Sequence, residues 1–99
     1  MDIVYRLQGM EFEWDENKAA SNIQKHGVTF EEAAEVFLDP FYQTGDASGD
    51  DKEERDFIIG YTFSQRLLLA VYTERGDRTR IVSARSATRA ERIVYEEAN

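Results

Sequence analysis

The first regular pattern along the chain is an alternation of apolar and polar residues over positions 10–14 (MEFEW), which predicts a short strand. Asp15 follows it and is a favourable helix N-cap residue. The next residues predict a helix that ends at Gly27, because glycine readily adopts the left-handed conformation common at helix C-termini. Lys25 and His26 support that end, since cationic side chains complement the negative end of the helix dipole.

A second helix is predicted to begin at Thr29, which forms a capping box with Glu32. Apolar residues recur there at helical spacing: Phe30, Ala33, Ala34 and Phe37. Pro40 ends the helix soon afterwards. Residues 44–54 (TGDASGDDKEE) are small, polar and acidic, so they are predicted to form a surface loop.

Three strands are predicted in the remaining part of the chain. In the first, over residues 57–63, every second residue is a large apolar or aromatic one on a single face. The second, residues 67–73 (LLLAVYT), is apolar on both faces, which is typical of a central strand. A tight turn centred on Gly76 leads into the third, residues 78–85, so these two strands form an antiparallel hairpin.

A second capping box, formed by Thr88 and Glu91, begins a final helix. The predicted fold class is therefore α+β. It has a short N-terminal strand, two helices, a three-stranded antiparallel sheet region and a C-terminal helix, with the helices packed against the sheet.

Composition narrows the function classes. The 99 residues, 41% of them hydrophobic, suit one domain with a single core. The absence of cysteine excludes disulfides, thiolate metal sites and a cysteine nucleophile. No stretch approaches the roughly 18 apolar residues of a membrane span, and the N-terminus lacks a signal-peptide layout, so we expect a cytoplasmic protein without membrane contact.

The formal net charge of −8 argues against a general nucleic-acid binder, because phosphate repels an acidic surface. The charges are unevenly distributed, however. Residues 31–56 hold ten acidic side chains against Lys52 and Arg55, whereas residues 66–92 hold seven arginines against three acidic side chains. Such asymmetry indicates either one basic working face or one acidic docking face, although scattered solvated charges are the alternative.

Three stretches in this order resemble the BrnT family, the toxin half of a bacterial type II toxin–antitoxin pair. They are residues 12–37 (FEWDENKAASNIQKHGVTFEEAAEVF), 54–77 (ERDFIIGYTFSQRLLLAVYTERGD) and 80–96 (RIVSARSATRAERIVYE). The resemblance implies a fold similar to the RelE group of ribonucleases, RNA cleavage that needs no metal or other cofactor, and inhibition of translation. It also implies a BrnA-like ribbon-helix-helix antitoxin that neutralises the toxin and represses the shared operon, so that DNA is contacted only through the antitoxin.

The chain departs from this family pattern in two places. Family members usually begin near the Phe-x-Trp-Asp element, so we expect a single toxin domain over residues 10–99, preceded by an extra segment, residues 1–9. That segment is either an added strand or not part of the toxin. Ser86 stands where the family commonly has lysine, and if that lysine contacts phosphate, activity in this chain is weakened.

The predicted helix over residues 15–27 carries the first group of site candidates. Metal-free RNA cleavage needs a base, an acid and cations for the charge that builds on phosphorus. His26 is the only histidine, and histidine can both accept and donate a proton near neutral pH. We expect a catalytic role for His26 and Lys25, with Lys18 and Asn22 binding RNA from the same helix face. The alternative is that Lys25 and His26 are ordinary residues of a helix C-terminus.

The second group of candidates lies where the last strand meets the last helix. Arg85 is expected to bind the scissile phosphate, because a guanidinium binds phosphate through two hydrogen bonds and the exposed amides of a helix start favour anions. Arg80 and Arg89 are expected to bind RNA. By strand parity Arg80 and Arg85 point to opposite faces. The alternative for Arg85 is an ion pair with an acidic residue that fixes the final helix. No residue cluster predicts a metal site.

The sequence is compatible with two functions from different classes. The first is a ribonuclease toxin that its antitoxin holds inactive. The second is a catalytically weakened BrnT-like domain that acts mainly as an antitoxin-binding co-repressor, which the overall acidity and Ser86 favour.

Overall fold

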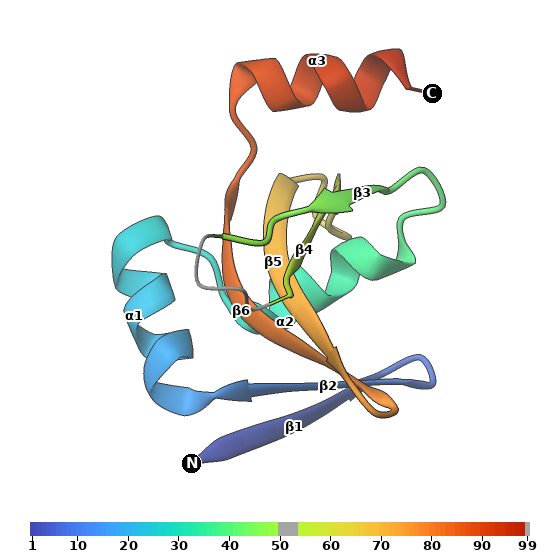
Figure 1. Ribbon diagram of the computed structural model, residues 1–99. Coiled ribbons are helices and arrows are strands. Elements are labelled where there is room, and N and C mark those ends of the chain that lie inside the picture. Colours follow the sequence, from blue (N-terminus) through green and yellow to red (C-terminus); the bar gives the residue numbers. More distant parts are fainter. Residues whose placement is uncertain (50–53, 99) are drawn as a thin grey trace.

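One mixed sheet runs through the molecule, with its strands in the order β1-β2-β6-β5-β4-β3 (Figure 1). This computed structural model describes residues 1–49 and 54–98. Neighbouring strands are antiparallel except β2 and β6, which are parallel. The strands are β1 (Asp2–Leu7), β2 (Met10–Asp15), β3 (Gln43–Asp46), β4 (Asp56–Tyr61), β5 (Leu67–Arg75) and β6 (Arg78–Ser86). The helices are α1 (Glu16–His26), α2 (Phe30–Glu35), the 3-10 helix η1 (Val36–Leu38) and α3 (Arg89–Glu97).

The fold class is α+β, but the predicted three-stranded antiparallel sheet is too small and lacks the parallel pair. β1 lies in the segment 1–9 and pairs with β2 along its whole length. β3 begins just before the predicted loop 44–54 and continues into it. Its sequence, QTGD, has no apolar alternation, so only its backbone pairing with β4 identifies it as a strand. Residues 50–53 of the predicted loop lie outside the described residues.

The caps confirm the predicted starts of α1, α2 and α3 and the predicted end of α1, whereas α2 ends at Glu35 and Phe37 lies in the 3-10 helix η1. The Asp15 carboxylate accepts a hydrogen bond from the backbone N–H of Lys18 at 3.0 Å and so begins α1. Gly27 ends it with a φ of +65°, in the left-handed region. Both capping boxes are present, one at the start of α2 and one at the start of α3.

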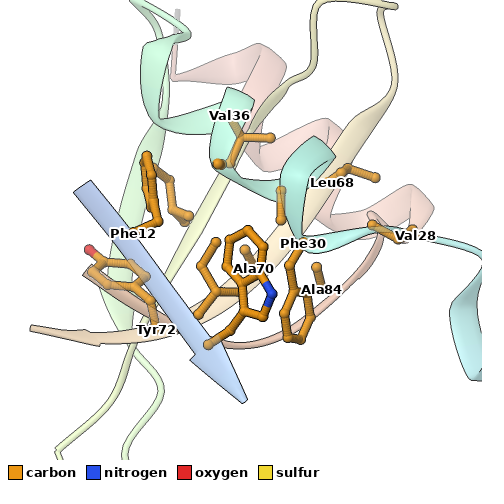
Figure 2. Close-up of a cluster of buried hydrophobic side chains, with 13 residues drawn as sticks. Phe12, Val28, Phe30, Val36, Leu68, Ala70, Tyr72 and Ala84 are labelled. Carbon is orange, nitrogen blue, oxygen red and sulfur yellow. The ribbon is translucent and has the colours of Figure 1, made fainter. Parts of the chain in front are cut away.

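α1 and α2 cover one face of the sheet, and the main core lies between that face and the helices (Figure 2). Aromatic rings fill much of it. Trp14 of β2 packs edge-on against Phe30 of α2, with ring centroids 5.7 Å apart. Phe37 of η1 lies between Phe12 and Tyr72, at 5.2 and 5.1 Å from their ring centroids. Such edge-to-face pairs add stability beyond simple burial, and they fix α2 on the sheet.

The opposite face of the sheet carries a smaller apolar cluster made by Ile59, Leu67, Leu69 and Tyr95. Side chains alternate along β5, so Leu67 and Leu69 point away from the main core while Leu68 and Ala70 point into it. Tyr95 brings α3 to this second cluster, and Figure 1 shows α3 apart from α1 and α2. The molecule therefore has one thoroughly covered sheet face and one that a single nine-residue helix covers in part.

Candidate functional site

The exposed surface of α1 carries three of the predicted site residues. Lys18, Lys25 and His26 are all exposed. Within residues 1–49 and 54–98, no ion pair or side-chain hydrogen bond engages any of the three. Their charged and polar ends are therefore open to a ligand. His26 is the last residue of α1, directly before the Gly27 turn.

Asn22 differs from its neighbours on α1, since it is 5% exposed and fully hydrogen-bonded inside the fold. Its amide nitrogen donates to the carbonyl oxygens of Val28 at 3.0 Å and Ala84 at 2.8 Å. Its amide oxygen accepts from the Ala84 N–H at 3.1 Å. The expectation that Asn22 contacts RNA does not fit this placement. Helical spacing predicts that Asn22 shares a helix face with Lys18 and Lys25. Spacing alone cannot indicate that α1 contacts β6 at Asn22.

A bulge in β6 changes which arginines share a face. Ser83 pairs with Val71 of β5 and Ile81 pairs with the next residue, so Val82 is an additional residue in β6. As a result Arg85 and Arg80, which pair with Leu69 and Thr73, lie on the same face of the sheet. The parity prediction that they point to opposite faces is therefore wrong, because it assumed a regular strand.

Arg85 forms a two-pronged ion pair with Glu91 of α3. Its two terminal nitrogens lie 2.7 and 2.9 Å from the two carboxylate oxygens. Glu91 also accepts the Thr88 N–H at 2.9 Å within the capping box. The hydrogen bond from Arg85, with further help from Thr88, lowers the pKa of Glu91 to about 2, and Glu91 in turn raises the pKa of Arg85. This is the alternative considered for Arg85, an ion pair that fixes the last helix.

Arg80 is held even more completely. Its side chain is 17% exposed and contacts Glu13 of β2 at 2.5 Å and both carboxylate oxygens of Asp2 of β1 at 3.1 Å. The hydrogen bonds that Arg80 donates to Asp2 are the main cause that raises the pKa of Arg80. Binding of RNA by Arg80 thus requires phosphate to displace a carboxylate.

Arg89 begins α3 and is exposed. In the described part of the chain it makes no ion pair or side-chain hydrogen bond. A hollow of about 560 Å³ lies between α3 and strands β3 to β6, and its walls include Ala90 and Glu91 of α3. Its walls are mostly apolar, and they include Arg85 and Glu91 together with Phe57, Ile59, Leu69, Val71 and Val94. An apolar floor with one guanidinium at its side can hold a planar ring and an anionic group.

The structure does not bring the two groups of candidates into contact. α1 packs on the core face of β6, where Asn22 reaches Ala84, whereas Arg85 points to the opposite face. Among the described residues no hydrogen bond joins Lys25 or His26 to Arg85. The two groups of candidates therefore do not form one site, and in the second group Arg80 and Arg85 are paired with carboxylates.

A buried carboxylate was missed by sequence reasoning. Asp39, 9% exposed, accepts hydrogen bonds from the Tyr95 hydroxyl at 2.6 Å and from the Tyr61 and Phe41 N–H groups, each at 2.8 Å. Burial raises the pKa of Tyr95, and the Asp39 carboxylate raises it further. Asp39 and Tyr95 are 56 positions apart, so no local pattern signals their contact.

The part of the chain that the structure describes shows neither a metal-binding cluster nor a membrane-spanning helix. No group of three or more histidine, cysteine or acidic side chains there is arranged to hold a metal ion. None of the helices there is long and apolar enough to cross a membrane.

Residues 14–91 match the model of a family described as the ribonuclease toxin BrnT of type II toxin–antitoxin systems. The chain belongs to this BrnT family. The crystal structure of the Brucella abortus ribonuclease toxin BrnT is similar, with a TM-score of 0.62 and 28% sequence identity over 77% of this chain and 94% of that chain. No curated protein sequence gives a significant match. The residues that match the BrnT model include every predicted site residue and begin after β1.

Proposed function

We propose that this chain is a metal-independent endoribonuclease that inhibits translation until an antitoxin neutralises it. The observation that carries the proposal is the match of residues 14–91 to the BrnT ribonuclease toxin family, with the structural similarity to the Brucella toxin in support. We further propose a RelE-like toxin domain over residues 10–99, to which β1 adds a strand, and a cytoplasmic location. Its antitoxin is a BrnA-like ribbon-helix-helix protein, and DNA is contacted only through that partner.

The exposed end of α1 supports a proton-transfer role for His26. An exposed imidazole can take a proton from a ribose 2′-hydroxyl and return one to the leaving oxygen. The neighbouring Lys25 supplies a cation for the charge that develops on phosphorus. Lys18 and Arg89, which are exposed as well, are proposed to bind the RNA backbone.

Arg85 requires an exchange of partners to act on phosphate. Its side chain is 39% exposed and borders the hollow beside α3, so a phosphate can approach it. A phosphate oxygen pair offers the same two-pronged geometry as the Glu91 carboxylate, and we propose that the scissile phosphate competes with Glu91 for Arg85.

A co-repressor with weakened catalysis is the second candidate, and specific observations favour it. Arg85 and Arg80 are both occupied by carboxylates, and Ser86 provides no cation where the family commonly has one. Such a chain binds its antitoxin and tunes repression without cutting RNA efficiently.

Inducing the chain alone in a bacterium, with growth and RNA integrity followed over time, separates the two candidates. A ribonuclease toxin arrests growth and degrades RNA, and co-expressed antitoxin reverses both effects. Normal growth with ample folded protein supports the co-repressor instead. An inactive His26→Gln variant expressed at the same level controls for the burden of expression.

A further inference from the structure

Two phenylalanines project from one small region of the surface. Phe41 follows η1 and Phe63 follows β4, and they are 58% and 57% exposed. Both border a second hollow of about 560 Å³, whose walls include Asp39, Tyr61 and Tyr95. Tyr42, 46% exposed, adjoins Phe41 in the chain. Two large rings that share the rim of one hollow form an exposed apolar patch of the kind that marks interaction sites.

Carboxylates hold the backbone beneath both rings. The Asp39 side chain accepts the Phe41 N–H at 2.8 Å, and the Glu35 side chain accepts the Phe63 N–H at 2.9 Å. Asp39 is fixed in turn by the Tyr61 N–H and the Tyr95 hydroxyl. Hydrogen bonds therefore fix the backbone of Phe41 and Phe63. A partner that packs against the two rings loses little affinity to ordering of this backbone.

The walls of this hollow are acidic as well as aromatic. Burial acts to raise the pKa of Asp39, but its three hydrogen bonds outweigh burial and lower the pKa overall, so the group is charged at neutral pH. Glu35 lies beside it, one helical turn after Glu31. Carboxylates next to exposed aromatic faces favour a cationic side chain, through charge-assisted hydrogen bonds and cation–π contact, and they repel phosphate.

We infer that this surface, formed by Glu35, Asp39, Phe41 and Phe63, is where the antitoxin docks a segment that carries arginine or lysine next to apolar residues. The inference rests on the proposed function and deepens it, because the walls of this hollow include none of Lys18, Lys25, His26 and Arg89, the residues proposed to serve RNA. Tyr95 lies in the wall of the same hollow, so a docked segment contacts the residue that fixes α3 to the sheet.

The test measures antitoxin binding and RNA cleavage on the same variants of the full chain. The probe is the antitoxin encoded with this chain, purified separately and titrated onto each variant. Phe41→Ser and Phe63→Ser should each weaken binding by about tenfold or more, as truncation of a central aromatic anchor typically does. Glu35→Gln keeps a hydrogen-bond acceptor for Phe63 but loses the charge, so it should weaken binding mainly at low salt.

Two matched variants serve as controls. Ile93→Ser removes another exposed apolar side chain, on α3, and Asp77→Asn removes an acidic charge at the β5–β6 turn, so both should bind the antitoxin like the parent. Parent-like affinity in all three test variants, or loss that the two controls share, overturns the inference. So does a result in which Phe41→Ser and Phe63→Ser lose RNA binding but keep the antitoxin. If the parent cleaves no RNA while the test variants still lose antitoxin, the proposed function fails and the docking surface stands.

Discussion

The side-chain amide of Asn22 binds both the N–H and the carbonyl of Ala84, as the backbone of a neighbouring strand would. β2 pairs with β6 only at Thr79 and Arg80. Farther along β6, at Ala84, the side chain of Asn22 forms the backbone hydrogen bonds that a neighbouring strand would form. One side chain thus fixes α1 to the strand that carries Arg85.

Asn22→Ala should therefore lower the free energy of unfolding by about 3 kcal/mol, because it leaves buried backbone groups of Ala84 and Val28 without partners. Urea denaturation measures the change. Asn17→Ala, an exposed position on the same helix, is the matched control and should change stability little. Equal stability of the two variants, with RNA binding lost only in Asn22→Ala, would restore the original interpretation of Asn22 as an RNA contact.

Arg85→Lys tests whether the guanidinium stabilises α3 through Glu91, binds the scissile phosphate, or does both. Lysine keeps the charge but cannot form the two-pronged contact with a carboxylate or a phosphate. The loss of the partly exposed pair with Glu91 should cost about 1 kcal/mol of stability. If Arg85 also binds the scissile phosphate, the cleavage rate of the folded fraction should fall by about tenfold or more. An unchanged rate assigns Arg85 to the structure alone.

Glu91 gives the ion pair a pH signature. Its pKa in the folded chain is about 2, below the ordinary value of 4.5, so the pair contributes stability that is fully present above about pH 4.5. That contribution is lost as the pH falls from 4.5 toward 2. The stability advantage of the parent over Glu91→Gln should therefore shrink over this range. Thermal unfolding of both chains at several pH values measures it, and a pH-independent difference contradicts the role of the Arg85 ion pair.

Asp2→Asn tests whether β1 restrains Arg80. The substitution removes one of the two carboxylates that hold the guanidinium, so RNA affinity should rise by a few fold if Arg80 faces RNA. Asp77→Asn changes the net charge equally at the β5–β6 turn and shows how much of any increase is a general charge effect. Fluorescence titration with a short RNA measures both variants. The same affinity in both assigns Arg80 to the fold alone.

Local chemistry made the helices predictable. Asp15, Gly27 and the capping boxes at Thr29 and Thr88 each act within four residues, so the sequence near them is sufficient. The strand hairpin around Gly76 was predictable for the same reason.

Features that depend on distant residues could not be predicted. β3 has no apolar period, and the parallel pairing of β2 with β6 joins parts of the chain more than sixty positions apart. The bulge at Val82 moved Arg80 to the face of Arg85, against a parity rule that holds only for regular strands. Lys18, Lys25 and His26 were recognisable as polar residues of an exposed helix face, whereas the burial of Asn22 follows from its contact with Ala84, 62 positions away.

Cleavage of RNA by the purified chain in the presence of excess chelator, compared with its His26→Gln variant, tests the central claim most directly. The parent should cut RNA at a rate that the chelator does not change. His26→Gln should be slower by roughly a hundredfold to ten-thousandfold, as expected for the loss of a proton-transfer group, while it melts at the same temperature and still binds the antitoxin. Cleavage that stops with chelator and returns with added metal contradicts the metal-independent mechanism, and a His26→Gln variant as fast as the parent contradicts the proposed role of His26.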